Sequence, residues 1–213
     1  MFIVSTIIIL FLSHQPVEKH LAAEKGKGFH INGLYWRFLV IIFLAVFATY
    51  LPQPLSPNFL QNQHGLNFSQ IGQLGSISSL GVVLLSLLLG QLEARLGFLL
   101  GQAAVGLFAL FFWQGNSWIW FAIGYFLLGG YRPMRALAAA QIRPLVPPAK
   151  IGLAYGIMET VSAAAVFLAP PIAGILYDLQ PVIIYISSIA LILLSIIIGV
   201  IFIPSPSQTR ERS

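Results

Sequence analysis

The feature that most constrains this chain is a series of long apolar runs that contain almost no charge. Seven such runs occur in the 213 residues: 1–13, 38–60, 69–92, 96–114, 117–141, 151–176 and 181–203. A helix needs about 20 apolar residues to cross the hydrocarbon core of a bilayer. The last six runs are long enough to cross, so the sequence predicts an all-α fold, a polytopic bundle of six transmembrane helices.

The runs divide the chain into four parts. As a helix, residues 1–13 would be only about 20 Å long, and they lack the positive region and cleavage site of a signal peptide. We interpret them as the remnant of a preceding transmembrane helix. Residues 14–37 carry mixed charge and are predicted to be a cytoplasmic linker loop. Residues 38–203 form the predicted six-helix bundle, and residues 204–213 a cytoplasmic tail.

The distribution of charge supports this division. Of the 17 Lys, Arg, Asp and Glu residues, 14 lie outside the predicted spans. When the connections are assigned alternately to two sides, one side receives nine basic residues and the other receives none. Cytoplasmic loops carry such an excess. We therefore expect a multi-pass protein of the plasma membrane, with the first loop and the C-terminus in the cytoplasm.

The composition excludes most other classes of protein. Hydrophobic residues make up 58% of the chain and charged residues 8%, whereas soluble domains carry about 25% charged residues. There is no cysteine, and the four histidines show neither HExxH nor i,i+4 spacing, so we expect no metal and no cofactor. The chain has no nucleophile elbow or phosphate-binding loop, so we expect no enzyme. The excess of basic residues is explained by membrane orientation, so we expect no nucleic-acid partner.

Prolines and glycines within the runs predict where helices break or pack closely. Pro52, Pro54 and Pro57 are expected to break the outer end of the first full span, and Pro170 and Pro171 to do the same late in the fifth. Two small-xxx-small pairs allow close approach of helices, or are ordinary packing glycines. They are Gly97 with Gly101 and Gly152 with Gly156.

The predicted outer ends of the spans carry two kinds of marker. Asn67 and Gln70 have the spacing of a capping box at the start of the second span. Trp113, Trp118 and Trp120 flank the short connection between the third and fourth spans, where aromatic residues anchor helices at the membrane interface. These tryptophans could also be packed aromatic residues without an anchoring role.

Four segments in order resemble parts of a major facilitator superfamily transporter. Residues 56–81 (SPNFLQNQHGLNFSQIGQLGSISSLG) resemble the end of the seventh helix, the following loop and the eighth helix. Residues 129–156 resemble the tenth helix, a short basic loop and the start of the eleventh helix. Residues 169–178 resemble the end of that eleventh helix. The second segment along the chain, GQLEARLG, is similar to the superfamily's loop pattern Gly-x-Leu-x-Asp-Arg-x-Gly. Its matching residues are Gly90, Leu92, Arg95 and Gly97.

The resemblance implies a fold and a function. It implies that the chain is the C-terminal six-helix half of a major facilitator fold, and that the four matching loop residues form a cytoplasmic gating loop. In that loop the acidic position is Ala94, so the charge contact of the gate lacks its usual carboxylate. Such transporters have two six-helix halves that hold the solute between them near the midplane.

The function that follows is that of a half or fragment of a secondary active transporter, which moves a small solute by alternating access. Its partners would be the lipid bilayer, the solute, and an N-terminal six-helix half or a second copy of the chain. The alternative is a six-helix membrane protein that binds another bundle without transporting, or a decayed fragment. A water-filled cavity along the helices would distinguish transport from this alternative.

Three charges inside the predicted spans are the candidate functional groups. Arg132 and Glu159 are predicted to lie at similar depth and to face each other, because intramembrane charges pair or face water. In the functional interpretation, Arg132 anchors a carboxylate or phosphate of the solute, and Glu159 carries a proton if it is buried. In the alternative, the two only neutralise each other. Arg135 lies nearer the interface and is expected to extend to the headgroups.

The resemblance implies further contacts with the solute. The first and fourth helices of each half line the cavity in this superfamily. The residues that this suggests are Tyr50, Gln53, Tyr125 and Arg132.

Overall fold

The structure is a computed structural model, and it describes residues 33–202. The predictions for residues 1–32 and 203–213 lie outside this range. The described elements are α2 (Gly33–Tyr50), α3 (Ser56–His64), α4 (Phe68–Gly90), α5 (Ala94–Gln114), α6 (Trp118–Leu128), α7 (Tyr131–Ala140), the 3₁₀ turns η2 (Arg143–Leu145) and η3 (Pro148–Lys150), α8 (Ile151–Leu179) and α9 (Ile183–Phe202). Five of these helices are long and apolar enough to cross a membrane. The prediction of an all-α membrane bundle is confirmed.

The first predicted span is divided between α2 and α3, as its prolines predicted. Residues 51–55 form a turn, in which the backbone N–H of Gln53 donates to the Tyr50 carbonyl over 3.0 Å. The Ser56 hydroxyl donates to the carbonyl of Pro52 and so satisfies an oxygen that the break leaves free. α3 then ends at Gly65, whose φ of +66° is a left-handed conformation that glycine adopts without strain.

The start of this span was predicted too late. Residues 33–37, assigned from sequence to the linker loop, belong to α2. Tyr35 explains the longer helix, because its side chain is fully buried and its hydroxyl donates to the Ala154 carbonyl of α8 over 2.7 Å. This contact links the start of α2 to the start of α8 across 119 residues of chain.

The fourth predicted span is not one continuous helix. It breaks between α6 and α7, where Gly129 and Gly130 donate to carbonyls three residues earlier. A Cβ added to Gly129 would lie 2.3 Å from the backbone nitrogen of Val82, and one added to Gly81 would lie 2.0 Å from the Phe126 carbonyl oxygen. The backbones of α4 and α6 therefore touch, and only glycine fits at this crossing.

The prediction of a break late in the fifth span was wrong. α8 runs without interruption from Ile151 to Leu179 and contains both Pro170 and Pro171. Its buried stripe of Ala165, Ala169 and Ala173 passes along this part of the helix. Membrane helices tolerate the backbone bonds lost at proline when neighbouring elements support them.

Of the remaining sequence predictions about helix ends and glycines, some are confirmed and others are not. The capping box is confirmed, because Asn67 and Gln70 exchange hydrogen bonds of 2.9 and 3.0 Å at the start of α4. Gly97 and Gly101 pack closely, since Cβ atoms there would meet side chains of α7 at 2.5 and 2.7 Å. Gly152 and Gly156 have no atom within 4 Å of an added Cβ in the described part of the chain, so they support no close packing there.

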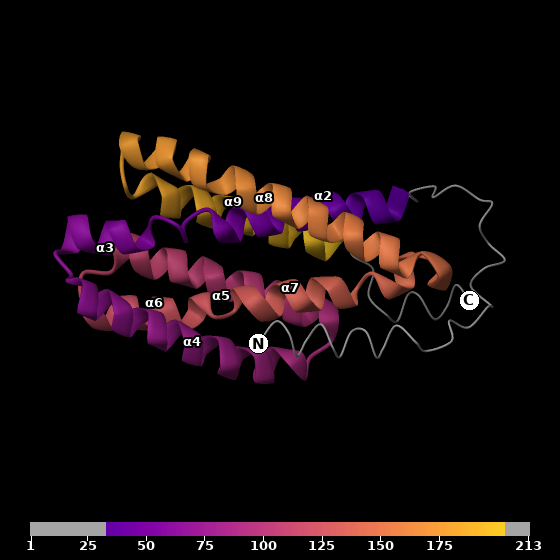
Figure 1. Cartoon of the computed structure of the whole chain (residues 1–213), viewed down its shortest axis with the longest axis horizontal. Helices are drawn as coiled ribbons and strands as arrows, with labels where there is room; N and C mark the ends of the chain where they lie inside the picture. The colour runs from indigo at the N-terminus through magenta and orange to yellow at the C-terminus, as the bar shows by residue number, and fades with distance from the viewer. Residues whose placement is uncertain (1–32, 203–213) are drawn as a thin grey trace, which may run out of the picture. The chain divides into compact units, whose positions relative to one another are not determined.

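The helices form two groups (Figure 1), and most of the contact between the groups is made by α5 with α9. One group contains α4, α5, α6 and α7, and the other contains α2, α8 and α9. Aromatic rings fill the interior near the α3 end, with Phe112 contacting Phe108, Phe121 and Tyr185 at centroid distances of 4.6 to 5.3 Å. The interior near α3 is therefore aromatic, and the charged residues Arg135 of α7 and Glu159 of α8 lie at the surface of the bundle.

Candidate functional site

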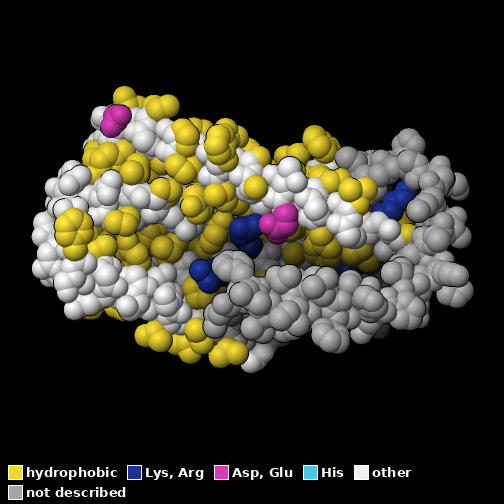
Figure 2. Space-filling view, in the orientation of Figure 1, with side chains coloured by type: hydrophobic (Ala, Val, Ile, Leu, Met, Phe, Trp, Pro, Cys, Tyr) yellow, Lys and Arg dark blue, Asp and Glu magenta, His cyan; other side chains and the backbone are white. Residues whose placement is uncertain are grey.

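An ion pair between α7 and α8 is the only one among residues 33–202. The Arg135 guanidinium donates from Nη2 to Oε2 of Glu159 over 2.6 Å. The side chains are 33% and 57% exposed. Figure 2 shows a basic and an acidic side chain adjoining on a face that is otherwise hydrophobic or uncharged over most of its described area. Charge is therefore accessible within an apolar surface.

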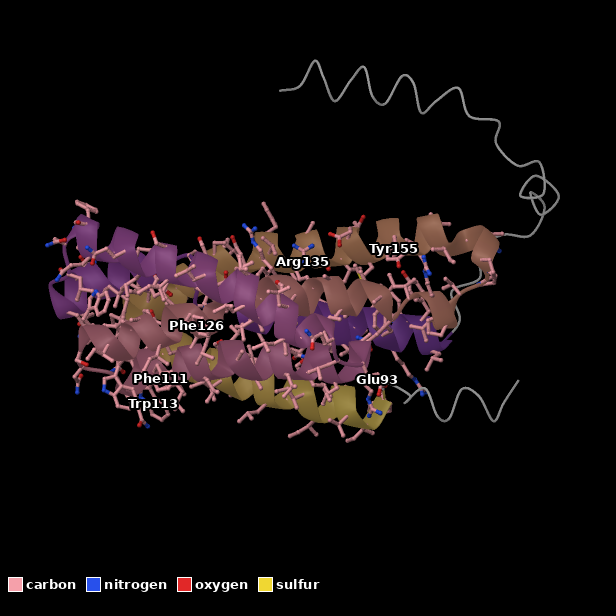
Figure 3. All side chains as sticks on the ribbon, turned by 90° about the horizontal axis from the view of Figure 1, so that it is seen from below. Glu93, Phe111, Trp113, Phe126, Arg135 and Tyr155 are labelled. Carbon is pink, nitrogen blue, oxygen red and sulfur yellow. The ribbon has the colours of Figure 1, made fainter. Side chains whose placement is uncertain are left out.

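The pair lies well away from both ends of the bundle. In Figure 3, Arg135 lies between the end marked by Trp113 and the end marked by Glu93. Glu159 is the ninth residue of α8, which places it roughly 12 Å from the start of that helix at 1.5 Å per residue. An exposed charge is costly in the hydrocarbon of a membrane, where such groups pair with one another or face water. The pairing of Arg135 with Glu159 offsets part of this cost.

The predicted pairing of Arg132 with Glu159 is wrong. Arg132 is exposed and makes no ion pair within the described range. The depth comparison treated residues 117–141 as one regular helix, whereas the turn at Gly129 and Gly130 interrupts the helical hydrogen bonding before α7. As a result Arg135, which was expected to extend to the headgroups, is the arginine that reaches α8.

Two tyrosines border the ion pair. The rings of Tyr50 and Tyr131 lie 5.9 Å apart, so the end of α2 meets the start of α7. Tyr131 lies within electrostatic range of both Arg135 and Glu159. Its hydroxyl is enclosed and makes no hydrogen bond of good geometry with the described residues. Three helices therefore converge on one polar cluster, which we define as Tyr50, Tyr131, Arg132, Arg135 and Glu159.

Tyr131 was missed by sequence reasoning. The sequence feature that could have indicated Tyr131 is its spacing of four residues from Arg135, which places both side chains on one face of a helix.

The other predicted contacts with the solute lie in different surroundings. Gln53 is half-buried in the turn after α2 and donates from Nε2 to the Thr49 carbonyl over 2.8 Å. Tyr125 is 7% exposed and packs against Phe108 and Phe112 in the aromatic core. The structure therefore brings Tyr50 to the charged pair, keeps Gln53 in the adjoining turn, and places Tyr125 inside the bundle.

The predicted gating loop lies at the opposite end from α3 and makes one contact that the sequence did not indicate. Arg95 donates from Nη2 to the Val200 carbonyl over 2.6 Å, near the end of α9. The last carbonyls of a helix lack backbone partners and carry partial negative charge, so this arginine stabilises the end of α9. Gly97 packs against Leu137, while Gly90 and Leu92 are exposed.

No cluster of three His, Cys, Asp or Glu side chains that could hold a metal ion occurs in the part of the chain that the structure describes. The charged groups available there are two guanidinium groups and one carboxylate. Guanidinium groups bind carboxylates and phosphates through paired hydrogen bonds. A cluster of this composition can bind an anionic group chemically.

Five helices that are long and apolar enough to cross a membrane define an integral membrane protein of the polytopic, all-helical class. Within this class, the sequence model of the Major Facilitator Superfamily matches residues 38–213. The chain belongs to this superfamily, a family of membrane transporters. A search of curated proteins finds no significant match to the chain.

Proposed function

We propose that the chain forms one six-helix half of a secondary transporter, which moves a small solute by alternating access and catalyses no chemical reaction. The observation that carries this proposal is the exposed ion pair between Arg135 and Glu159. In a membrane, an exposed pair of this kind is stable where it borders water or polar groups. A cavity shared by two halves provides such an environment at the midplane.

The burial of the helices supports the position of this cavity. α2 and α5 are half buried within the bundle, whereas α4 and α8 leave most of their residues uncovered. Glu159 lies on α8, and Arg135 on the helix next to it in sequence. The charged face therefore adjoins a weakly covered helix, on the side where a second half would complete the cavity.

The residues of the cluster have separate proposed roles. Arg132, which has no ionic partner among residues 33–202, anchors a carboxylate or phosphate of the solute. Glu159 holds Arg135 while the site is empty and releases it to an anionic group of the solute. The side chain of Glu159 is 57% exposed, so the burial that was expected of a proton carrier is absent. Tyr50 and Gln53 supply neutral hydrogen-bonding groups at the outer side of the site. Tyr125 supports the cavity wall from within the core.

The second wall is supplied by an N-terminal six-helix half or by a second copy of this chain. The superfamily architecture supports this, because the solute site lies between two six-helix halves. We further propose that the assembled protein lies in the plasma membrane with the basic loops in the cytoplasm, from the count of nine basic residues against none.

Water accessibility of the charged face tests the proposal directly. The chain has no cysteine, so each introduced cysteine is the only thiol. Ala136→Cys and Ala163→Cys place it one turn from Arg132 and Glu159, whereas Leu194→Cys and Ile197→Cys place it on exposed apolar positions of α9. A charged maleimide should label the first two in membranes, and only a lipid-soluble maleimide should label the α9 pair. Equal labelling of all four by the charged reagent would contradict a localised cavity.

Transport itself is tested in liposomes that contain the purified chain alone or with a co-expressed N-terminal half. A panel of radiolabelled small organic anions is added outside, and their uptake into the liposomes is measured. We expect uptake only with both halves present, and its reduction in Glu159→Gln. Stable association of the halves without any flux, while the charged face excludes the maleimide, would favour the alternative of a non-transporting interaction protein. Flux by the chain alone would assign the second wall to another copy.

A further inference from the structure

The interface between α5 and α9 contains two buried polar side chains that the charged cluster does not use. Gln102 of α5 and Ser195 of α9 are both 0% exposed. Neither end of the Gln102 amide, nor the Ser195 hydroxyl, has a hydrogen-bond partner among the described residues. Buried polar groups are nearly always hydrogen-bonded in folded proteins, to protein or to ordered water. Gln102 and Ser195 therefore each need a hydrogen-bond partner beyond the described residues, and the two could share one.

The register of the two helices places them at one level. α5 and α9 run antiparallel, because Arg95 reaches the Val200 carbonyl while a Cβ at Gly106 would lie 3.4 Å from Ile192. Gln102 lies four residues from Gly106 towards the Arg95 end. Ser195 lies three residues from Ile192 towards the same end. Each step covers about one helical turn, so Gln102 and Ser195 face the same layer of the interface.

Both side chains also belong to the inward faces of their helices. On α5, Gln102 continues the buried stripe of Phe98, Val105 and Phe112, with spacings of three to seven residues. On α9, Ser195 belongs to the buried stripe that is formed by Tyr185, Ser188, Ile192 and Gly199. The two stripes meet at Phe112 and Tyr185, whose ring centroids are 5.3 Å apart. Gln102 and Ser195 are therefore directed into the same interior.

The chemistry of this interior selects the ligand. No Asp, Glu, Lys or Arg lies between Phe98 and Phe112, or anywhere in α9, so nothing there compensates the charge of an ion. The amide offers two donors and an acceptor, and the hydroxyl offers one donor and an acceptor. A ligand for both must be neutral, must donate and accept, and must fit a fully enclosed space. We propose that Gln102 and Ser195 together bind one ordered water molecule within the membrane-spanning part of the bundle.

This water joins the two groups of helices. α5 belongs to the group with α4, α6 and α7, and α9 to the group with α2 and α8. The rest of the interface at this level is apolar, with Phe98 and Ile192 on either side. The bound water gives the interface a polar contact that fixes the register of one group against the other.

A double-mutant cycle tests whether the two side chains share a ligand. Gln102→Leu, Ser195→Ala and the double variant are compared by thermal unfolding of the purified full chain in detergent. Each single variant should lower Tm by roughly 2–4 °C, a typical effect of a modest stability loss in a chain of this size. The double variant should lose clearly less than both losses together, because no polar group is then left without a partner. Additive losses would overturn the proposal.

A substitution that displaces the water distinguishes a bridged pair from a direct hydrogen bond. Ser195→Asn supplies a carboxamide in the place of the water, and Ser195→Leu is the control of similar size. With Gln102 present, the Asn variant should have the higher Tm, and this advantage should disappear in the Gln102→Leu background. An Asn variant no more stable than the Leu variant would overturn the water site. If neither folds, the cycle with alanine decides the question.

Discussion

Arg135 and Glu159 show what the sequence can and cannot predict about single residues. That three charges lie within the spans follows from counting, because so few charged residues occur in apolar runs. Which arginine meets the carboxylate depends on how α7 packs beside α8, and the turn between α6 and α7 interrupts the regular helix before it. Sequence spacing alone treats Arg132 and Arg135 as successive positions on one continuous helix. The presence of charged groups within the spans was therefore predictable, but their pairing was not.

The ion pair predicts a specific pattern of stability. Arg135→Gln and Glu159→Gln should each lower Tm by roughly 2–4 °C, because each leaves a charge without its partner. The double variant should regain part of this loss. Arg132→Gln is the matched control and should change Tm little, since Arg132 has no ionic partner within the described range. A larger effect from Arg132→Gln than from Arg135→Gln, in thermal unfolding of the purified chain, would reject this assignment.

His64 predicts a dependence of stability on pH. Its ring lies between those of Phe59 and Phe121, at centroid distances of 5.1 and 4.6 Å, outside the membrane-spanning helices. Partial burial lowers the pKa of His64 below its usual 6.5, because desolvation disfavours the charged form. The unfolded chain therefore takes up the proton first as the pH falls. The contribution of neutral His64 to the stability of the folded chain is complete above about pH 6.5, and it is lost as the pH falls through the lowered pKa of His64.

The measurement is Tm between pH 8 and pH 5 for the natural chain and for His64→Phe, which keeps an aromatic ring and cannot titrate. The variant should lose less stability than the natural chain on acidification. Identical pH profiles would show that other groups cause the dependence.

The helices themselves were predictable to within a few residues where apolar runs end at charged or polar connections. α4 and α5 begin and end close to their predicted bounds, and the capping box located the start of α4. Interruptions within runs were less predictable, because they depend on tertiary contacts. The prolines before Ser56 break the chain, but Pro170 and Pro171 do not. The break falls at the pair Gly129 and Gly130, where the backbone packs against α4, and the sequence prediction did not use this pair as a helix-breaking signal.

The crossing of α4 and α6 gives a prediction with a control on the same helix. In Gly81→Ala, the new Cβ would lie 2.0 Å from the Phe126 carbonyl oxygen, so the backbones must separate. We expect a loss of roughly 1–3 kcal/mol, as for other overpacked interiors. Gly72→Ala adds a methyl group where no atom lies within 4 Å, and should leave stability unchanged or slightly raised. Equal effects of the two substitutions on Tm would refute the close crossing.

At the scale of the whole molecule, the charge count predicts an orientation. Gln63 lies near the end of α3, and Arg143 lies in the turn after α7, and both side chains are exposed. Gln63→Cys should react with an impermeant thiol reagent in intact cells. Arg143→Cys should react only after the cells are opened. The unsubstituted chain, which has no cysteine, is the blank for both. The reverse pattern would invert the proposed topology.

The grouping of α2 with α8 and α9 also has a consequence for biosynthesis. The Ser188 hydroxyl donates to the Ala48 carbonyl, and these residues are 140 positions apart in the chain. At about 5–20 residues per second, a ribosome needs roughly 7–28 s to make this stretch. During that interval the inward face of α2, with its buried Tyr35 and Thr49, lacks its final neighbours. Membrane chaperones and quality-control proteases would meet this protein in that interval, with α2 as the exposed element.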